Sequence, residues 1–287
     1  MTDATPLVAV VPTFQPGKEV LSLVGYLAEN CTGIVVSDDA SPCTSDPILE
    51  DLARQYPVSV VRHGRNQGIA RGLNDGLKFA QSAGAIWLLT IDQDSVLPRN
   101  YAQRLLAAAH HRVDLGEPLG AIGAKVILDR EGEMTYPHQG PSGKMTTEEV
   151  IQTGTLWSVQ AMTDLGGFDE SLGIDAVDAA ACLALRQRGF NIGLADDLAL
   201  EHRLGSSRSV RLGGRNIMIT GHSPERRATM IRNRLRLFPA EFRQSPRHAL
   251  RTIRRVAVNQ SFGLITETDR AAKLGGTIRG IRSQRNG

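Results

Sequence analysis

Short apolar runs alternate with longer amphipathic segments through the first third of the chain, and this alternation constrains the fold most. Residues 7–11 (LVAVV) form a continuous apolar run that ends at Pro12. Residues 18–30 place apolar side chains at helical spacing, and residues 33–37 (GIVVS) form a second apolar run. Such runs are typical of parallel strands covered by helices on both faces. The pattern therefore predicts an α/β fold with a mostly parallel sheet.

The elements that we expect further along the chain become less regular after residue 113. We expect helices over 46–55, 68–83, 159–166 and 175–189, strands over 57–62, 85–91 and 119–128, strand and turn over 150–158 and 191–200, and loops over 129–148 and 204–222. Residues 224–257 are expected to form Arg-rich helices that Pro239 and Pro246 interrupt.

Composition excludes several classes of protein. Hydrophobic residues make up 41% and charged residues 22% of the 287 residues, which excludes disordered and fibrous chains. No apolar run approaches the roughly 18–20 residues of a membrane span, and the N-terminus lacks the basic region of a signal peptide. The three widely spaced cysteines predict neither a disulfide framework nor a zinc cluster, and they fit a cytoplasmic protein.

Charge divides the chain unevenly. Residues 1–224 contain 18 Lys and Arg against 26 Asp and Glu, whereas residues 225–287 contain 15 against 4. A basic tail favours contact with an anionic membrane surface, nucleic acid or another protein, including a second copy of the chain; the alternative is a pair of solvated Arg-rich helices. Because the tail lacks interleaved aromatic residues and a recognisable binding motif, we expect no nucleic-acid partner.

Polar side chains follow each of the first four predicted strands. They are Thr13, then Asp38 and Asp39, then Arg65 and Asn66, and then Asp92 and Asp94. The carboxyl ends of parallel strands meet at one edge of a sheet, where ligands bind in such folds. The sequence therefore predicts one polar rim with a ligand site.

Asp92-Gln93-Asp94 carries the sharpest chemical signal in this rim. Two carboxylates just past a buried strand can face one Mg²⁺ or Mn²⁺, with phosphate oxygens completing its shell. An ion held in this way neutralises a diphosphate leaving group. The alternative is a pair of solvated turn residues.

The other rim residues each have a bland alternative. Asp38 and Asp39 suit contact with a ribose or base, or else a turn that leads into Ser41. Arg65 and Asn66 suit a phosphate beside a helix N-terminus, or else Asn66 is simply the helix cap.

An ordered set of motifs resembles family 2 glycosyltransferases. It comprises Pro12-Thr13-Phe14, residues 36–41, residues 66–70 with Gly72 and Asn74, residues 91–95, residues 166–170 and residues 174–178. Gln93, the segment His222-Ser223-Pro224 with Arg227, and the ending at 278–281 resemble the bacterial rhamnosyltransferase branch. The resemblance implies a GT-A type Rossmann-like domain, a nucleotide-diphosphate sugar donor and inverting transfer. The donor that it favours is dTDP-L-rhamnose.

The resemblance also implies site residues. Asp94, Asp92 and His202 would hold the metal, and the donor would contact Pro12, Thr13, Phe14, Asp38, Asp39, Arg65, Asn66, Gly68, Asn74, Asp92, Gln93, Gly154, Trp157 and Arg227. Trp157 could instead fill the core, which is the safer expectation for a lone aromatic residue. The remaining histidines, His63, His110, His111, His138 and His248, are expected at the surface or in loops, and His222 could touch the diphosphate.

Asp178 occupies the position of the family's general base, with Asp175 as the fallback. The alternative for Asp178 is a carboxylate that only stabilises a helix N-terminus. This sequence departs from the family in the run Ala179-Ala180-Ala181, where relatives carry acidic and aromatic residues, and it lacks a Tyr-Tyr pair after Arg227. The acceptor is therefore the open question.

The resemblance also implies a domain division. We expect a glycosyltransferase domain over 1–222, with a nucleotide-sugar half to about residue 98 and an acceptor half over 99–222, and a basic helical extension over 223–287. The acceptor would be a glycan, a glycolipid or a small molecule, reached at the inner membrane face by peripheral attachment. The alternatives are the same fold with another donor, such as UDP-galactofuranose, or a nucleotide-sugar-binding protein without turnover.

Overall fold

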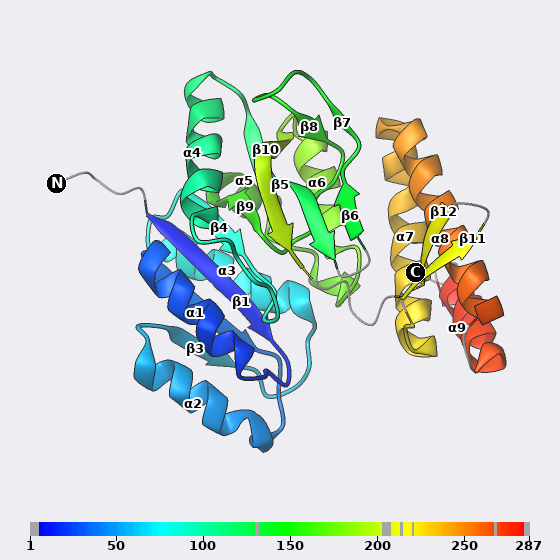
Figure 1. Ribbon diagram of the computed structural model, residues 1–287, viewed down its shortest axis with the longest axis horizontal. Coiled ribbons are helices and arrows are strands. Elements are labelled where there is room, and N and C mark those ends of the chain that lie inside the picture. Colours follow the sequence, from blue (N-terminus) through cyan, green and yellow to red (C-terminus); the bar gives the residue numbers. More distant parts are fainter. Residues whose placement is uncertain are drawn as a thin grey trace. The chain divides into compact units, whose positions relative to one another are not determined.

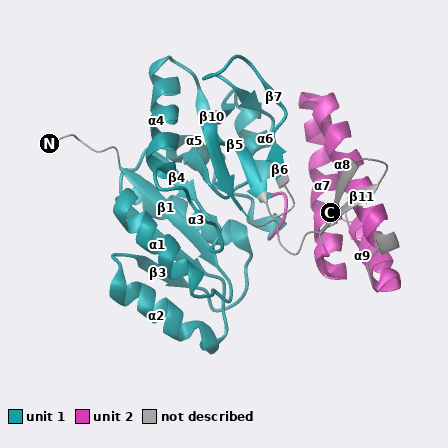
Figure 2. Ribbon diagram, in the orientation of Figure 1, with its two compact units in different colours: residues 1–128, 133–173, 177–202 teal, residues 129–132, 174–176, 203–287 magenta. Residues whose placement is uncertain are grey.

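The computed structural model describes residues 6–129, 132–202, 208–212, 215–219, 221–266 and 269–283. The chain divides into two compact units, which Figure 2 colours separately. Unit 1 comprises residues 1–128, 133–173 and 177–202, and unit 2 comprises residues 129–132, 174–176 and 203–287.

Unit 1 is built on a central mixed sheet (Figure 1). Strands β1 (Leu7–Thr13), β2 (Gly33–Asp38), β3 (Ser59–Arg62) and β4 (Trp87–Thr90) run parallel in the order β3-β2-β1-β4. The parallel arrangement is thus confirmed for the first four strands. The α/β class is the one that the sequence predicts.

The second half of the sheet contains antiparallel pairs. Strand β9 (Thr155–Ser158) lies antiparallel between β4 and β5 (Leu119–Asp129), and β10 (Asn191–Glu201) runs parallel to β5. The short strands β8 (Thr146–Thr147) and β7 (His138–Gln139) extend the sheet beyond β10, and β6 (Gly132–Thr135) pairs with β5. Because β9 is antiparallel to both of its neighbours, β4 and β5 point the same way, and β10 points the same way as β5.

Helices cover both faces of this sheet, which is why the first strands can be apolar throughout. One layer contains α1 (Glu19–Asn30), α2 (Asp46–Gln55) and α4 (Tyr101–Asp114), and the other contains α3 (Ile69–Ser82), α5 (Val159–Leu165) and α6 (Val177–Gln187). The apolar face expected for α1 is buried. The periodicity of the sequence indicated no element where α4 lies.

Unit 2 contains a hairpin and three helices among its described residues. They are β11 (Arg208–Leu212), β12 (Arg215–Ile219), α7 (Pro224–Gln244), α8 (Pro246–Thr266) and α9 (Arg270–Ser283). The prediction of a loop over 204–222 is therefore wrong for the two strands. Two β-prone segments around a Gly-Gly pair are a hairpin signal that the arginines and glycines obscure.

Proline affects the helices of unit 2 at only one of the two predicted points. Pro246 begins α8, as expected, but α7 continues through Pro239, contrary to prediction. Pro239 is exposed, so the carbonyl group that it releases from helical hydrogen bonding can meet water. Across the described part of the chain, no helix combines the length and apolarity that crossing a membrane requires.

Candidate active site

Three predicted metal ligands lie together in unit 1, and we call Asp92, Asp94 and His202 the acidic cluster. Asp92 follows β4 and His202 follows β10, and these two strands end at the same edge of the sheet. Their ligand atoms all lie within 4.8 Å of one another, and Asp92 Oδ2 is 3.5 Å from His202 Nε2. Two carboxylates are donors that suit Mg²⁺ and Mn²⁺, and the added imidazole favours a transition metal such as Mn²⁺.

Buried hydroxyl groups orient this cluster from behind. Ser95 Oγ lies 3.3 Å from His202 Nδ1 and 2.8 Å from Thr153 Oγ1, which accepts a 2.9 Å hydrogen bond from the Asp92 amide. We assign Nδ1–H as the donor to Ser95 and the Ser95 hydroxyl as the donor to Thr153, since this satisfies every contact in the chain. The Nε2 lone pair then faces Asp92, as a metal-ligating histidine requires.

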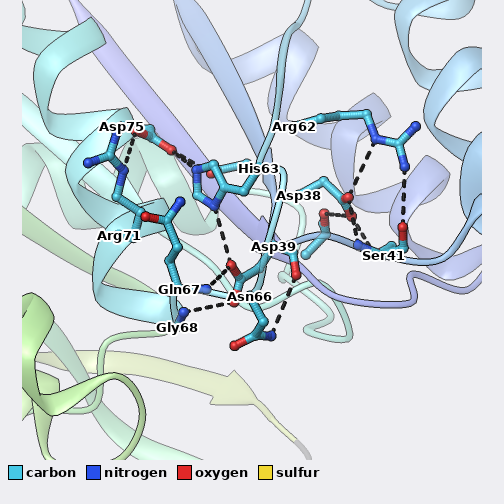
Figure 3. A network of polar contacts seen from close by, with 12 residues as sticks. Asp38, Asp39, Ser41, Arg62, His63, Asn66, Gln67, Gly68, Arg71 and Asp75 are labelled. Carbon is cyan, nitrogen blue, oxygen red and sulfur yellow. Dashed lines mark hydrogen bonds and ion pairs between the residues drawn. The ribbon is translucent and has the colours of Figure 1, made fainter.

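A second group of polar residues joins the ends of the parallel strands; we call it the rim network, and Figure 3 shows its contacts. It comprises Asp38, Asp39, Ser41, Arg62, His63 and Asp75, with the amides of Gln67 and Gly68. The two carboxylate oxygens of Asp39 accept hydrogen bonds from Gln67 N at 2.7 Å and Gly68 N at 2.9 Å. Asp39 thus fixes the entry to α3.

His63 crosses the rim network between two carboxylates. Its Nδ1 lies 3.3 Å from Asp39 Oδ1 and its Nε2 lies 2.7 Å from Asp75 Oδ2. His63 lies in the loop after β3, which was one of the two expected positions, but only 5% of its side chain is exposed. His248 in α8 is also buried, whereas His111 and His138 are exposed, as expected. An isolated histidine in a sequence gives no sign of the carboxylates that will enclose it.

Asp38 is fully buried and closes the turn after β2. It accepts hydrogen bonds from Thr13 Oγ1 at 3.2 Å and from the Ser41 amide at 3.0 Å, and Arg62 Nε lies 3.6 Å away. These contacts match the turn alternative and leave no exposed surface for a nucleotide. Thr13 is buried with it, whereas Pro12 is partly exposed.

Gln93 links the acidic cluster to the end of β1. Its Oε1 accepts a 2.9 Å hydrogen bond from the Phe14 amide, and its Nε2 donates to the Phe14 carbonyl at 3.2 Å. This pair holds Phe14 in a position where 47% of the residue remains exposed. An exposed aromatic ring at a strand end can stack on a base, which suits the predicted role.

The entry to α3 is shaped by backbone geometry. Gly68 caps the helix with φ of 87°, and a Cβ there would lie 2.4 Å from the Gly173 carbonyl oxygen. No side chain caps α3, so Asn66 is not the helix cap; its Nδ2 donates to the Asp39 carbonyl at 3.5 Å. Arg65 is exposed at the tip of this loop.

Three other residues expected near the donor lie inside the scaffold. Asn74 binds the Phe168 backbone through both amide atoms, at 2.8 and 3.0 Å. Trp157 is fully buried, donates to Thr90 Oγ1 at 2.9 Å and packs edge-on against Phe168. Gly154 has φ of 70°, and a Cβ there would lie 2.5 Å from the Leu200 side chain. Core filling, the alternative for Trp157, describes its position.

Asp178 lies in the first turn of α6 and is partly exposed. Its Oδ1 accepts a 2.8 Å hydrogen bond from the Ala179 amide. Burial raises the pKa of Tyr136 well above its ordinary value, and the charges of Asp178 and Glu149 raise it further. Burial raises the pKa of Cys182 in the same way, with a smaller contribution from Asp178. Asp178 is thus a partly exposed carboxylate near the buried side chains of Tyr136 and Cys182.

Two further predicted residues belong to unit 2. Asp175 has φ of 64°, pairs with Arg226 at 3.1 Å, and its carbonyl accepts a hydrogen bond from Asn233 Nδ2 at 2.9 Å. Arg227 is buried and donates to the Gln260 carbonyl at 3.5 Å.

Sequence reasoning missed Ser95 and Thr153, although Ser95 directly follows the aspartate pair.

Comparisons with known proteins agree with this geometry. The family described as "Glycosyl transferase family 2" matches residues 9–123. The dTDP-rhamnosyl transferase RfbF of Shigella flexneri is 29% identical over 240 residues, which cover 78% of this chain and 77% of that protein.

Solved structures share the fold at low sequence identity. Mannosyltransferase PcManGT from Pyrobaculum calidifontis, in complex with GDP-Man and Mn²⁺, has a TM-score of 0.59 at 15% identity, covering 99% of this chain and 83% of that one. TarS 1-349 from S. aureus, in complex with UDP-GlcNAc, has a TM-score of 0.60 at 15% identity, covering 97% and 80%.

The fold is the GT-A type fold of these glycosyltransferase structures, and the acidic cluster lies at the carboxyl ends of its strands. Residues 9–123 match glycosyltransferase family 2, and over 78% of its length the chain is similar to a dTDP-rhamnosyl transferase.

Proposed function

We propose that the enzyme transfers L-rhamnose from dTDP-L-rhamnose, with inversion, to a hydroxyl group of a glycan, glycolipid or small-molecule acceptor. The similarity to a dTDP-rhamnosyl transferase supports this donor. Donor binding falls to residues 1–98 and acceptor binding to residues 99–222, with residues 223–287 as a basic extension.

One observation carries the proposal: the acidic cluster and the exposed ring of Phe14 are joined through Gln93. The cluster suits the diphosphate end of a nucleotide sugar, and the ring suits its base. Asp94, Asp92 and His202 would hold a Mg²⁺ or Mn²⁺ ion, which when bound neutralises charge on the leaving diphosphate.

Asp178 accepts the proton of the acceptor hydroxyl in the proposed reaction. The hydroxyl oxygen forms a bond to the anomeric carbon while the bond from that carbon to the diphosphate oxygen breaks. Its partial exposure lets Asp178 meet an acceptor. Ala179 and Ala181 are buried, so of the alanine run only the partly exposed Ala180 can face an acceptor.

A donor panel tests the proposal directly. Hydrolysis of dTDP-L-rhamnose, UDP-galactofuranose, UDP-glucose and GDP-mannose is followed with Mn²⁺, with Mg²⁺ and with a chelator. We expect turnover that needs the metal and is fastest with dTDP-L-rhamnose. Faster turnover of UDP-galactofuranose would establish the alternative donor. Metal-dependent binding without turnover of any donor would favour the binding protein.

The base is tested by Asp178→Asn, which keeps the shape of the side chain but cannot take up the proton. We expect transfer to fall by at least about 10²-fold while donor affinity is retained, since general base catalysis typically contributes 10²–10⁴-fold. If Asp178→Asn remains active and Asp175→Asn does not, Asp175 is the base.

A further inference from the structure

Helix α9 turns its glycines toward α7. Gly276 and Gly280 are four residues apart and therefore share one face of the helix. A Cβ on Gly276 would lie 2.2 Å from the Pro224 carbonyl oxygen, and one on Gly280 would lie 2.5 Å from the Ala228 carbonyl oxygen. Only glycine permits this close approach, so the inward face of α9 is fixed by backbone packing.

The large apolar side chains of α9 lie on the opposite face. Leu274, Ile278 and Ile281 are 48%, 40% and 45% exposed, and their spacing of four and three residues places them in one stripe. Exposed Arg282 and Arg279 follow along one side of this stripe, and Arg279 lies 3.8 Å from Glu225 Oε1 while 60% of its side chain stays exposed. An apolar stripe that a helix directs outward while packing through glycine indicates a binding surface rather than a misplaced core.

We propose that this outward face of α9 binds the surface of an anionic lipid bilayer. Leu274, Ile278 and Ile281 enter the boundary between headgroups and acyl chains, while Arg279 and Arg282 contact the lipid phosphates. The surface goes beyond the proposed transfer reaction and does not depend on it.

Charge selects lipid as the occupant. Residues 225–287 carry 15 Lys and Arg against 4 Asp and Glu, and α8 exposes a further row at Arg247, Arg251 and Arg254. In a twofold contact with a second copy, the arginines beside the stripe would face one another. The stripe is also small against the roughly 800 Å² per partner of a stable interface. Nucleic acid would match the arginines but not the aliphatic side chains between them.

The test is sedimentation of the full-length protein with vesicles. One set contains equal parts of phosphatidylcholine and phosphatidylglycerol, and the other contains phosphatidylcholine alone. We expect binding only to the anionic vesicles, weakening as salt is raised. The triple variant L274Q/I278Q/I281Q should bind at least about tenfold more weakly. The double variant R279Q/R282Q should lose about fivefold per arginine.

Matched variants in unit 1 separate this surface from general stickiness. V113Q/L115Q removes two exposed apolar side chains, and R54Q/R188Q removes two exposed charges. Both controls should bind like the wild type, and thermal unfolding should be unchanged in all four variants. Failure to bind anionic vesicles, or equal loss in controls and α9 variants, would overturn the proposal. The proposal would also be overturned if the triple variant bound vesicles like the wild type but light scattering showed a changed oligomeric state, because the stripe would then be a contact between copies. Donor turnover is measured separately, so the two proposals fail independently.

Discussion

The rim network and the acidic cluster use the same residue type at the same edge of one sheet, but in different ways. In the rim network, Asp38 is fully buried and Asp39 is nearly so, and protein donors occupy their carboxylates. In the acidic cluster, Asp94 is exposed, and Asp92 accepts a hydrogen bond from Gln152 through Oδ1 while its Oδ2 faces His202. Asp38 and Asp39 are thus parts of the scaffold, whereas the cluster gathers ligand atoms around one point.

Burial explains the difference. A buried carboxylate must be matched by donors within the protein, because its desolvation is costly. A partly exposed carboxylate keeps its solvation and can exchange water for a ligand. A polar residue after a parallel strand therefore marks the ligand edge of the sheet, but its burial decides whether it supports the fold or is available to a ligand.

The largest effect on stability should come from Asp39→Ala. The substitution removes the acceptor for Gln67 N and Gly68 N and leaves His63 with a single carboxylate partner. We expect the free energy of unfolding to fall by roughly 3–5 kcal/mol, since hydrogen bonds to a buried charge are lost together. Chemical denaturation measures it. A loss of stability no larger than that of Asp94→Ala would contradict the scaffold role of Asp39.

Asp94→Ala should act in the opposite manner. Because Asp94 is exposed, we expect the free energy of unfolding to change by less than about 0.5 kcal/mol. Metal-dependent donor affinity should fall at least about 100-fold, since a ligand matters more than the 10–100-fold effect of an outer partner. Titration calorimetry with Mn²⁺ and nucleotide measures this, with the exposed Asp114→Ala as matched control. Unchanged affinity would place the metal elsewhere.

The sequence predicted the parallel half of the sheet well, because its runs are apolar throughout. Val20, Leu23, Val24 and Leu27 of α1 are all buried, as their spacing indicated. Strand β9 lies within the strand and turn predicted over 150–158, but its antiparallel direction was not predicted, since the direction of a strand depends on its partners and not on its own residues. Helix α4 escaped because alanines and histidines interrupt its apolar face.

Ser95→Ala should give an intermediate effect. Without the hydroxyl group, Nδ1 of His202 loses its partner and the imidazole is no longer oriented toward Asp92. We expect Mn²⁺ affinity to fall about tenfold, and Ser95→Thr to restore it because the hydroxyl is retained. Electron paramagnetic resonance of free Mn²⁺ measures both without turnover. Loss in His202→Ala but not in Ser95→Ala would exclude the positioning role and keep the metal site.

Part of the candidate site was predictable from spacing alone. Asp92 and Asp94 stood out because two carboxylates follow one apolar run, and His202 entered through the family resemblance. Ser95, Thr153 and His63 could not be predicted, because their roles depend on partners far along the chain. Ser95 lies 58 residues from Thr153 and 107 from His202, and His63 lies 24 residues from Asp39. Local sequence carries no information about such partners.

The smallest effect concerns Asp196, which accepts hydrogen bonds from Ser142 Oγ and from Gly143 N but is less buried than Asp39. The Ser142 hydrogen bond lowers the pKa of Asp196; burial opposes this, and the Gly143 amide lowers the pKa further. A lowered pKa stabilises the fold above the ordinary pKa of the group, and this stabilisation is lost as the pH falls. Ser142→Ala should therefore cost less than about 0.5 kcal/mol at neutral pH and nothing in acid. Denaturation at pH values from neutral down to about 2 measures it. If the cost matched that of Asp39→Ala, the number of donors rather than burial would separate the two kinds of carboxylate.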